Sequence, residues 1–329
     1  MRARRLIVAL AVALLAAPLA AEARQPAGRV AKIGLLLTGS PSVTRHYTEA
    51  LRLGLHHLEY VESQNVAFEA RWAEGGKPEE FRGLAAELAG ANVSLIFALG
   101  TTATAAAKQA TATIPIVFVA VGDPVGSSLV ASLSRPGGNV TGQTNISAEL
   151  SAKLLELLRE VAPQANPVAV LRNPANPVSV PQLRWTEVAA RTLQVELQVV
   201  EARAPHELDD AFAAIARRGA RALIVLPDPM FLSQRSRIAE LAVRAQLAAA
   251  FNWRDYAEAG GLLSYGPNLL DQIRRSASMI DKILRGAKPA DLPVEQPTKF
   301  ELVINMKTAK VLGLTIPASV LVRADQIID

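Results

Sequence analysis

The sequence predicts an α/β fold with two doubly wound parallel-sheet lobes joined by a multi-strand hinge. Two observations predict it. First, short apolar runs alternate with segments of helical spacing, a pattern typical of parallel strands linked by right-handed crossovers. Second, this alternation runs from residue 32 to residue 121 and then restarts near residue 148, so the chain holds two similar units in tandem. The length of 329 residues, about twice that of a typical domain, agrees with two compact units.

The first unit is expected to contain four strands. Residues 32–40 form an apolar run that stops at small polar residues, which is the form of a buried parallel strand entering a loop. Residues 66–72 alternate like a second strand, and the apolar runs 93–99 and 114–121 supply the third and fourth. Helices are expected between the strands, at 45–58, 79–90 and 103–110.

The second unit repeats this pattern after the polar stretch 134–145. Its expected strands lie at 168–171, 195–200, 222–226 and 248–251, and its expected helices at 148–161, 181–192, 206–217 and 233–246. A strand at 260–265, a helix at 268–284, a proline-bearing connector at 289–297 and a strand at 300–305 follow. We expect residues 30–145 with about 255–288 to form lobe 1, and residues 146–254 with about 289–329 to form lobe 2. The chain would then cross between the lobes about three times.

The N-terminal residues predict an exported precursor. Arg2, Arg4 and Arg5 form a basic region, residues 6–19 form an apolar stretch, and the stretch is followed by the small-x-small sequence Ala21-Glu22-Ala23. This stretch is shorter than the ~20 apolar residues that a membrane-spanning helix needs. We therefore expect residues 1–23 to be a signal peptide that is cleaved after about Ala23. The chain has no cysteine, so a free periplasmic protein is favoured over one tethered through a lipid-modified cysteine.

Composition and motifs argue against several other classes of protein. The net charge of +5 comes from basic residues scattered among acids, which does not favour a nucleic-acid partner. The four histidines, at positions 46, 56, 57 and 206, lack metal-ligand spacing, and there is no dinucleotide, P-loop or nucleophile-elbow motif. We therefore expect no metal, no cofactor and no catalytic residue, although an enzyme that uses the same cleft remains an alternative.

Polar loops follow the predicted strands, where ligands bind in open parallel sheets. Gly100-Thr101-Thr102 opens a helix and offers backbone N–H groups and hydroxyls to an anion, and a ligand carboxylate is the natural guest. An ordinary N-cap is the alternative for these residues. Asp123 and Asp228 could accept hydrogen bonds from a ligand amine or hydroxyl. Both aspartates precede prolines and could equally be turn formers, as could Asn173 and Asn176.

The sequence resembles the ABC-transporter substrate-binding proteins of type I periplasmic-binding fold, the family that includes tryptophan- and tyrosine-binding receptors. The matching segments cover essentially the whole chain after residue 23. They are Tyr60–Val66, Arg71–Gly75, Ile114–Phe118, Gly122–Val125, Ser134–Gly142, Asn173-Pro174 with Asn176-Pro177, Gly260–Gly266 and Gln296–Asn305. The resemblance implies that loops facing the cleft bind the ligand, which in this chain are Ser40, Thr101, Thr102, Asp123, Asn145, Asn173, Asn176, Asp228, Phe231 and Tyr265.

The resemblance also implies a receptor that closes on its solute and presents it to an ABC permease of the inner membrane, with no chemistry of its own. We expect a monomeric periplasmic protein that binds a small carboxylate-bearing solute, of which amino acids are one class, with Phe231 or Tyr265 in contact with the apolar body of the solute. The alternative function is ligand sensing, in which the closed protein docks on a membrane-bound sensor.

Overall fold

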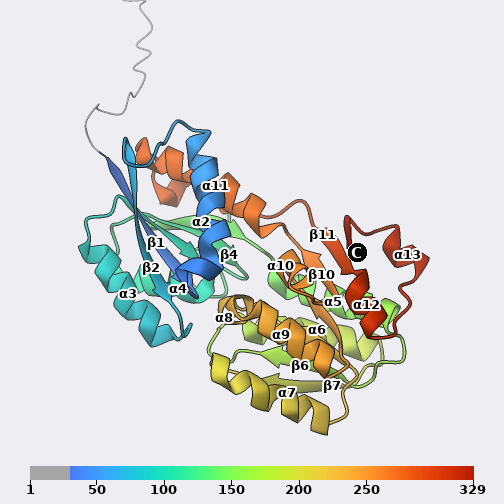
Figure 1. Cartoon of the computed structure of the whole chain (residues 1–329). Helices are drawn as coiled ribbons and strands as arrows, with labels where there is room; N and C mark the ends of the chain where they lie inside the picture. Colours follow the sequence, from blue (N-terminus) through green and yellow to red (C-terminus); the bar gives the residue numbers. More distant parts are fainter. Residues whose placement is uncertain (1–29) are drawn as a thin grey trace, which may run out of the picture.

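The computed structural model describes residues 30–329 as two lobes, each built on one β-sheet (Figure 1). The expected signal peptide, residues 1–23, lies outside the described residues. No helix among residues 30–329 has the length and apolarity required to cross a membrane. The fold class predicted from the sequence is confirmed, since both sheets are almost entirely parallel and carry helices on both faces.

Lobe 1 contains a five-stranded parallel sheet in the order β2-β1-β3-β4-β5. Its strands are β1 (Ala31–Thr38), β2 (Val66–Ala73), β3 (Leu95–Leu99), β4 (Ile116–Val121) and β5 (Val140–Thr144). Alternate residues of the central strands pack on opposite faces: Phe97 lies in the cluster with α2 (Pro41–His56) and α11 (Leu269–Leu284), and Ile96 in the cluster with α3 (Pro78–Gly90) and α4 (Thr101–Ala110). Burial on both faces explains why these strands are apolar throughout.

Lobe 2 contains a seven-stranded sheet in the order β12-β11-β10-β9-β8-β6-β7. Its strands are β6 (Val168–Arg172), β7 (Leu197–Glu201), β8 (Ala222–Val225), β9 (Ala248–Phe251), β10 (Leu263–Gly266), β11 (Glu301–Asn305) and β12 (Gln326–Ile328). Only the β10–β11 pair is antiparallel. One face packs against α5 (Ser147–Val161) and α6 (Ser179–Thr192), and the other against α7 (Leu208–Arg217) and α9 (Arg235–Arg244).

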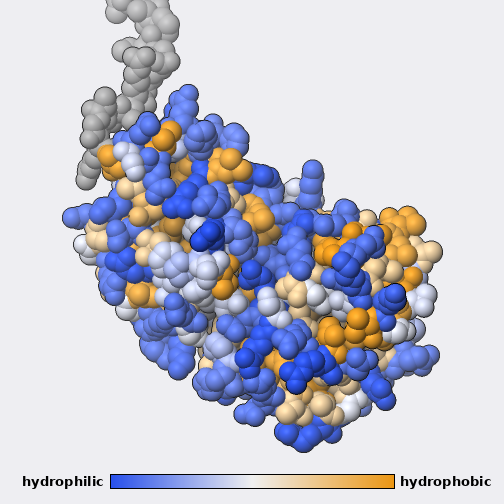
Figure 2. Space-filling view, viewed as in Figure 1, coloured by the Kyte–Doolittle hydropathy of each residue, from blue (hydrophilic) through white to orange (hydrophobic). Residues whose placement is uncertain are grey.

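Short helices complete lobe 2. They are α8 (Pro229–Ser233), α10 (Arg254–Glu258), α12 (Met306–Val311) and α13 (Ala318–Leu321), with 3-10 turns η1 (Pro205–Glu207) and, beside β5 of lobe 1, η2 (Pro289–Asp291). Figure 2 shows a surface that is largely hydrophilic on the face drawn, with hydrophobic residues gathered near α12 and α13, where Val311 and Val322 are exposed.

The assignment of the later segments to the lobes differs from the expected boundaries. Residues 255–288 were expected in lobe 1, but α10 contacts β10 and β11, and β10 pairs with β9 in the seven-stranded sheet. Only α11 packs on lobe 1, mainly against α2. After α11 the backbone of Glu295 pairs with β5 of lobe 1 before β11 returns to lobe 2. The chain therefore passes between the sheets three times: before α5, before α11 and before β11.

Candidate functional site

The candidate site lies between the carboxyl ends of the two sheets, where α8 of lobe 2 contacts the loops of lobe 1. A Cβ atom on Gly100 would lie 2.5 Å from Cγ of Pro229, and one on Gly76 would lie 2.9 Å from Cβ of Met230. Both glycines also have positive φ angles, 90° for Gly100 and 65° for Gly76, which favour glycine on their own account. The side chains of α8 in lobe 2 thus pack directly against the backbone of lobe 1, and the structure represents a closed arrangement.

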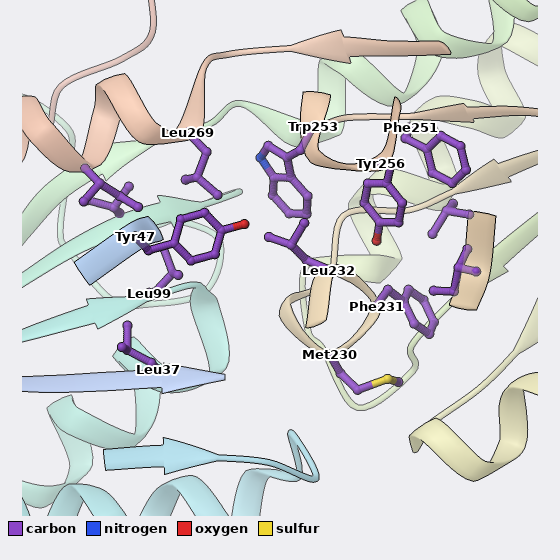
Figure 3. Packing of buried hydrophobic residues seen from close by; sticks show 14 of the residues in the cluster. Leu37, Tyr47, Leu99, Met230, Phe231, Leu232, Phe251, Trp253, Tyr256 and Leu269 are labelled. Carbon is purple, nitrogen blue, oxygen red and sulfur yellow. The ribbon is translucent and has the colours of Figure 1, made fainter. Parts of the chain in front are cut away.

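A small cavity remains between the closed lobes. Its volume is about 20 Å³, which is space for roughly one water molecule. Most of its wall is apolar. The lining residues are Thr38, Val43, Thr44, Tyr47, Leu99, Gly100 and Ala120 from lobe 1, Pro229, Leu232, Ser233, Arg235 and Trp253 from lobe 2, and Leu269 at the start of α11. Figure 3 shows Tyr47, Leu232, Trp253 and Leu269 converging there from both lobes. Arg235 is the one charged residue in this lining.

Three of the residues predicted from the sequence lie together in lobe 2. Asp228 is buried at the start of α8, where Oδ1 accepts hydrogen bonds from the backbone N–H groups of Met230 (2.9 Å) and Phe231 (3.2 Å). Its Oδ2 accepts from the amide groups of Asn173 (3.2 Å) and Asn176 (3.0 Å). Burial raises the pKa of Asp228, and these four hydrogen bonds only partly oppose the effect of burial. In the closed structure this carboxylate therefore fixes the loops that carry α8.

The candidates of lobe 1 lie in the loops after the strands and at the start of α4. Asp123 is half-buried and accepts a hydrogen bond from the N–H of Gly126, so it forms a turn. Asn145 is buried, and its Oδ1 accepts a hydrogen bond from the N–H of Ser147.

The remaining lobe 1 candidates lie at or just before the starts of two helices. Thr101 is buried and Thr102 is half-buried at the start of α4. Ser40 precedes α2, and its Oγ lies 3.0 Å from that of Ser42. The Thr101–Thr102 end of α4 is the end that Pro229 covers.

The two predicted aromatic contacts lie in the cores rather than in the cavity lining. Phe231 has no exposed surface and belongs to the apolar cluster that runs from lobe 1 into lobe 2. Tyr265 lies on β10, stacks on Phe300 with ring centroids 6.0 Å apart, and packs against the cluster on the α5 side of the sheet. Neither side chain lines the cavity described above.

The sequence analysis did not identify a hydrogen-bonded contact between the lobes near this cavity. Tyr47 Oη on α2 donates to Oδ1 of Asp255 on α10 at 2.8 Å, and His46 Nε2 lies 3.2 Å from the same oxygen. Burial acts to raise the pKa of Asp255, but these hydrogen bonds and the nearby Arg235 cation outweigh burial, so the pKa lies below its ordinary value. Burial together with the Asp255 charge raises the pKa of Tyr47 well above its ordinary value. This contact therefore consists of a carboxylate and a neutral phenol.

Comparisons with known proteins identify the family of this chain. The model of the family described as ABC transporter substrate binding protein matches residues 39–328. A curated relative named tyrosine-binding protein, from Clostridioides difficile strain R20291, is 25% identical over 78% of this chain and 73% of its own length.

Two solved structures cover 91% of this chain and the whole of their own length. The structure of a conserved domain protein from Vibrio cholerae is 30% identical, with a TM-score of 0.84. The structure of an ABC domain from Streptococcus pneumoniae in complex with L-Trp is 26% identical, with a TM-score of 0.83. The resemblance found in the sequence is thereby confirmed, and the chain belongs to the family of ABC transporter substrate-binding proteins.

Proposed function

We propose that this protein is the periplasmic receptor of an ABC importer and binds an amino acid with a large apolar or aromatic side chain between its lobes. The observation that carries the proposal is the cavity at the lobe interface, whose wall combines apolar and aromatic side chains with a single cation, Arg235. An amino acid offers a carboxylate to a cation and an apolar side chain to such a wall. The tyrosine-binding name of one relative and the L-Trp complex of another support the same class of solute.

The small volume of the cavity supports binding that is coupled to a motion of the lobes. A space of about 20 Å³ is far below the several hundred Å³ of typical small-molecule sites, so a solute enters only when the lobes stand further apart. The three chain crossings between the sheets are the natural hinge for this motion. A solute that contacts both lobes then shifts the population toward a closed arrangement whose cavity is widened around the solute, by the difference between its affinities for the open and closed states.

The remaining features of the proposal follow from this role. The partners are the small-molecule solute and the inner-membrane permease that receives it, and the protein acts as a monomer without nucleic acid. Residues 1–23 serve as the cleaved signal peptide that delivers the chain to the periplasm. The protein returns its solute unchanged and performs no catalysis.

A thermal-shift screen of the purified protein tests the proposal. L-tryptophan, L-tyrosine, L-phenylalanine, L-leucine and L-glutamate are compared, because a ligand that binds only the folded state raises the melting temperature. We expect the aromatic amino acids to raise it and glutamate to leave it unchanged, and mass spectrometry should recover the bound amino acid intact. A protein that responds to none of them, or that converts the bound amino acid, would not be this receptor.

A further inference from the structure

The first residue of α9, Arg235, places a cation beside the cavity. Arg235 lines the cavity, is half-buried, and donates one hydrogen bond through its guanidinium, to the carbonyl oxygen of Leu232 at 3.3 Å. Within residues 30–329 no acidic side chain lies within ion-pair distance of it. Arg237, two residues along the same helix, is by contrast exposed and paired with Asp209. A partly dehydrated guanidinium that makes no ion pair is a favourable binding site for an anion.

Two buried acids of the lobe interface make their hydrogen bonds with other groups. The positive charge of Arg235 helps to lower the pKa of Asp255, but the hydrogen bonds of the Asp255 carboxylate are made with Tyr47 and His46. Asp228 accepts four hydrogen bonds from its own lobe. Neither carboxylate contacts Arg235, so the guanidinium remains available to a ligand.

Two buried polar groups of the same cavity also have no partner. Trp253 is 3% exposed and its indole Nε1 makes no hydrogen bond, and Thr38 is 5% exposed and its Oγ1 makes none. The indole N–H can only donate, and the hydroxyl can donate. Together with Arg235, the cavity wall therefore offers three kinds of hydrogen-bond donor and no negative charge. A carboxylate is the ligand group that such a wall satisfies, since it accepts a bidentate pair from arginine and further hydrogen bonds.

We propose that Arg235 binds the carboxylate of the solute, assisted by Trp253 Nε1 and Thr38 Oγ1, while the apolar part of the solute packs beside Tyr47 and Leu232. This inference rests on the proposed function and places the carboxylate at α9 of lobe 2 rather than at Thr101 and Thr102 of lobe 1. Because Thr38 belongs to lobe 1 and Arg235 to lobe 2, a carboxylate between them joins the two lobes. Recognition of the carboxylate thereby favours closure.

A comparison of the affinities for amino acids and for their carboxamides distinguishes carboxylate binding by Arg235 from a purely structural role of this residue. Isothermal titration calorimetry gives the Kd of L-tryptophan, L-tyrosine and the two corresponding carboxamides for the wild-type protein and for Arg235→Gln. We expect the wild-type protein to prefer the acids by about 10- to 100-fold, the worth of a charge-assisted hydrogen bond, and Arg235→Gln to lose most of that preference. The ratio is measured within each variant, so a change in the folded fraction does not affect it. Arg235→Lys, which keeps the charge without the bidentate fork, should be intermediate.

Arg237→Gln is the matched control, because it removes an arginine from the same helix outside the cleft. It should keep the wild-type preference for the acids. If the wild-type protein binds the amino acids and Arg235→Gln retains the same acid-to-amide ratio, the role of Arg235 is overturned and the receptor function stands. If the wild-type protein binds neither acids nor amides, the solute class and the role of Arg235 fall together.

Discussion

Tyr47 of lobe 1 donates a hydrogen bond to Asp255 of lobe 2, with 2.8 Å between Oη and Oδ1 and both side chains buried. The bond is made to a charged group inside the lobe interface, and separation of α2 from α10 would break it. Its strength therefore adds directly to the free energy that separates the closed from the open arrangement. An apparent solute affinity that depends on the closed state then depends on this pair as well.

The Tyr47→Phe variant tests this dependence. It removes the phenolic hydroxyl and leaves the ring in place, and the loss of a hydrogen bond to a charged group should cost the closed state about 1.5–3 kcal/mol. We expect small-angle scattering to show a larger radius of gyration for the solute-free variant, and calorimetry to show weaker binding of its amino acid. Tyr60→Phe is the control, since Tyr60 also donates to an aspartate, Asp281, but does so without joining the two sheets. Equal effects in both variants would contradict a specific role for the interlobe bond.

Asp255 also predicts how stability depends on pH. Its pKa lies below the ordinary value because the hydrogen bonds from His46 and Tyr47, with the charge of Arg235, outweigh burial. A carboxyl with a lowered pKa stabilises the folded protein above its unfolded-state pKa of about 3.9, and this contribution is lost as the pH falls through the lower folded-state pKa. The Asp255→Asn variant lacks that contribution. In urea unfolding its free energy should therefore fall less on acidification than that of the wild-type protein, and parallel losses would refute the assignment.

The central strands that sequence patterns predicted are buried on both faces. Residues Leu95–Leu99 read as a continuous apolar run because helices cover both sides of the sheet. The strand Val140–Thr144 was missed because its sequence, VTGQT, is polar although the whole strand is buried. Its hydroxyls are satisfied by distant segments: Thr141 Oγ1 donates to Leu292 O, and Thr144 Oγ1 donates to Val121 O. Local periodicity carries no information about such partners.

Sequence patterns predicted only part of the candidate site, again because a local pattern does not reveal which distant residues come together. The rule that ligands lie at the carboxyl ends of parallel strands selected the loops of Asn173, Asn176 and Asp228, and the structure brings these three side chains together. Tyr47 and Arg235 were missed because each lies within an ordinary helical pattern. Their significance comes from which residues of the opposite lobe they face, and that depends on how the two sheets are placed.

The glycine contacts of α8 predict that closure is sensitive to a single methyl group. In Gly100→Ala the new Cβ would lie 2.5 Å from Cγ of Pro229, so the lobes could close only with distortion. The matched control is Gly260→Ala, which has a similar positive φ, 101° against 90°, but no atom within 4 Å of its Cβ. Both variants carry the strain of a positive φ, and we expect only Gly100→Ala to weaken solute binding and to remain open in scattering experiments. Adding Pro229→Gly to Gly100→Ala should restore part of the lost solute binding. If the effects of the two substitutions on binding are simply additive, the contact between these residues is contradicted.

Substitutions of Asp228 distinguish a structural role of its carboxylate from a ligand-binding role. Asp228→Ala leaves the N–H groups of Met230 and Phe231 and the amides of Asn173 and Asn176 without their acceptor, so the free energy of unfolding should fall by about 2–4 kcal/mol. Asp228→Asn keeps the acceptor for α8 but turns an amide donor toward two others, and should be intermediate. Asp123→Ala, which removes one hydrogen bond at a half-exposed turn, should cost less than about 1 kcal/mol. If Asp228→Ala instead weakens solute binding while the stability in urea unfolding is unchanged, the main role of the carboxylate is to bind the ligand amine rather than to hold the loops.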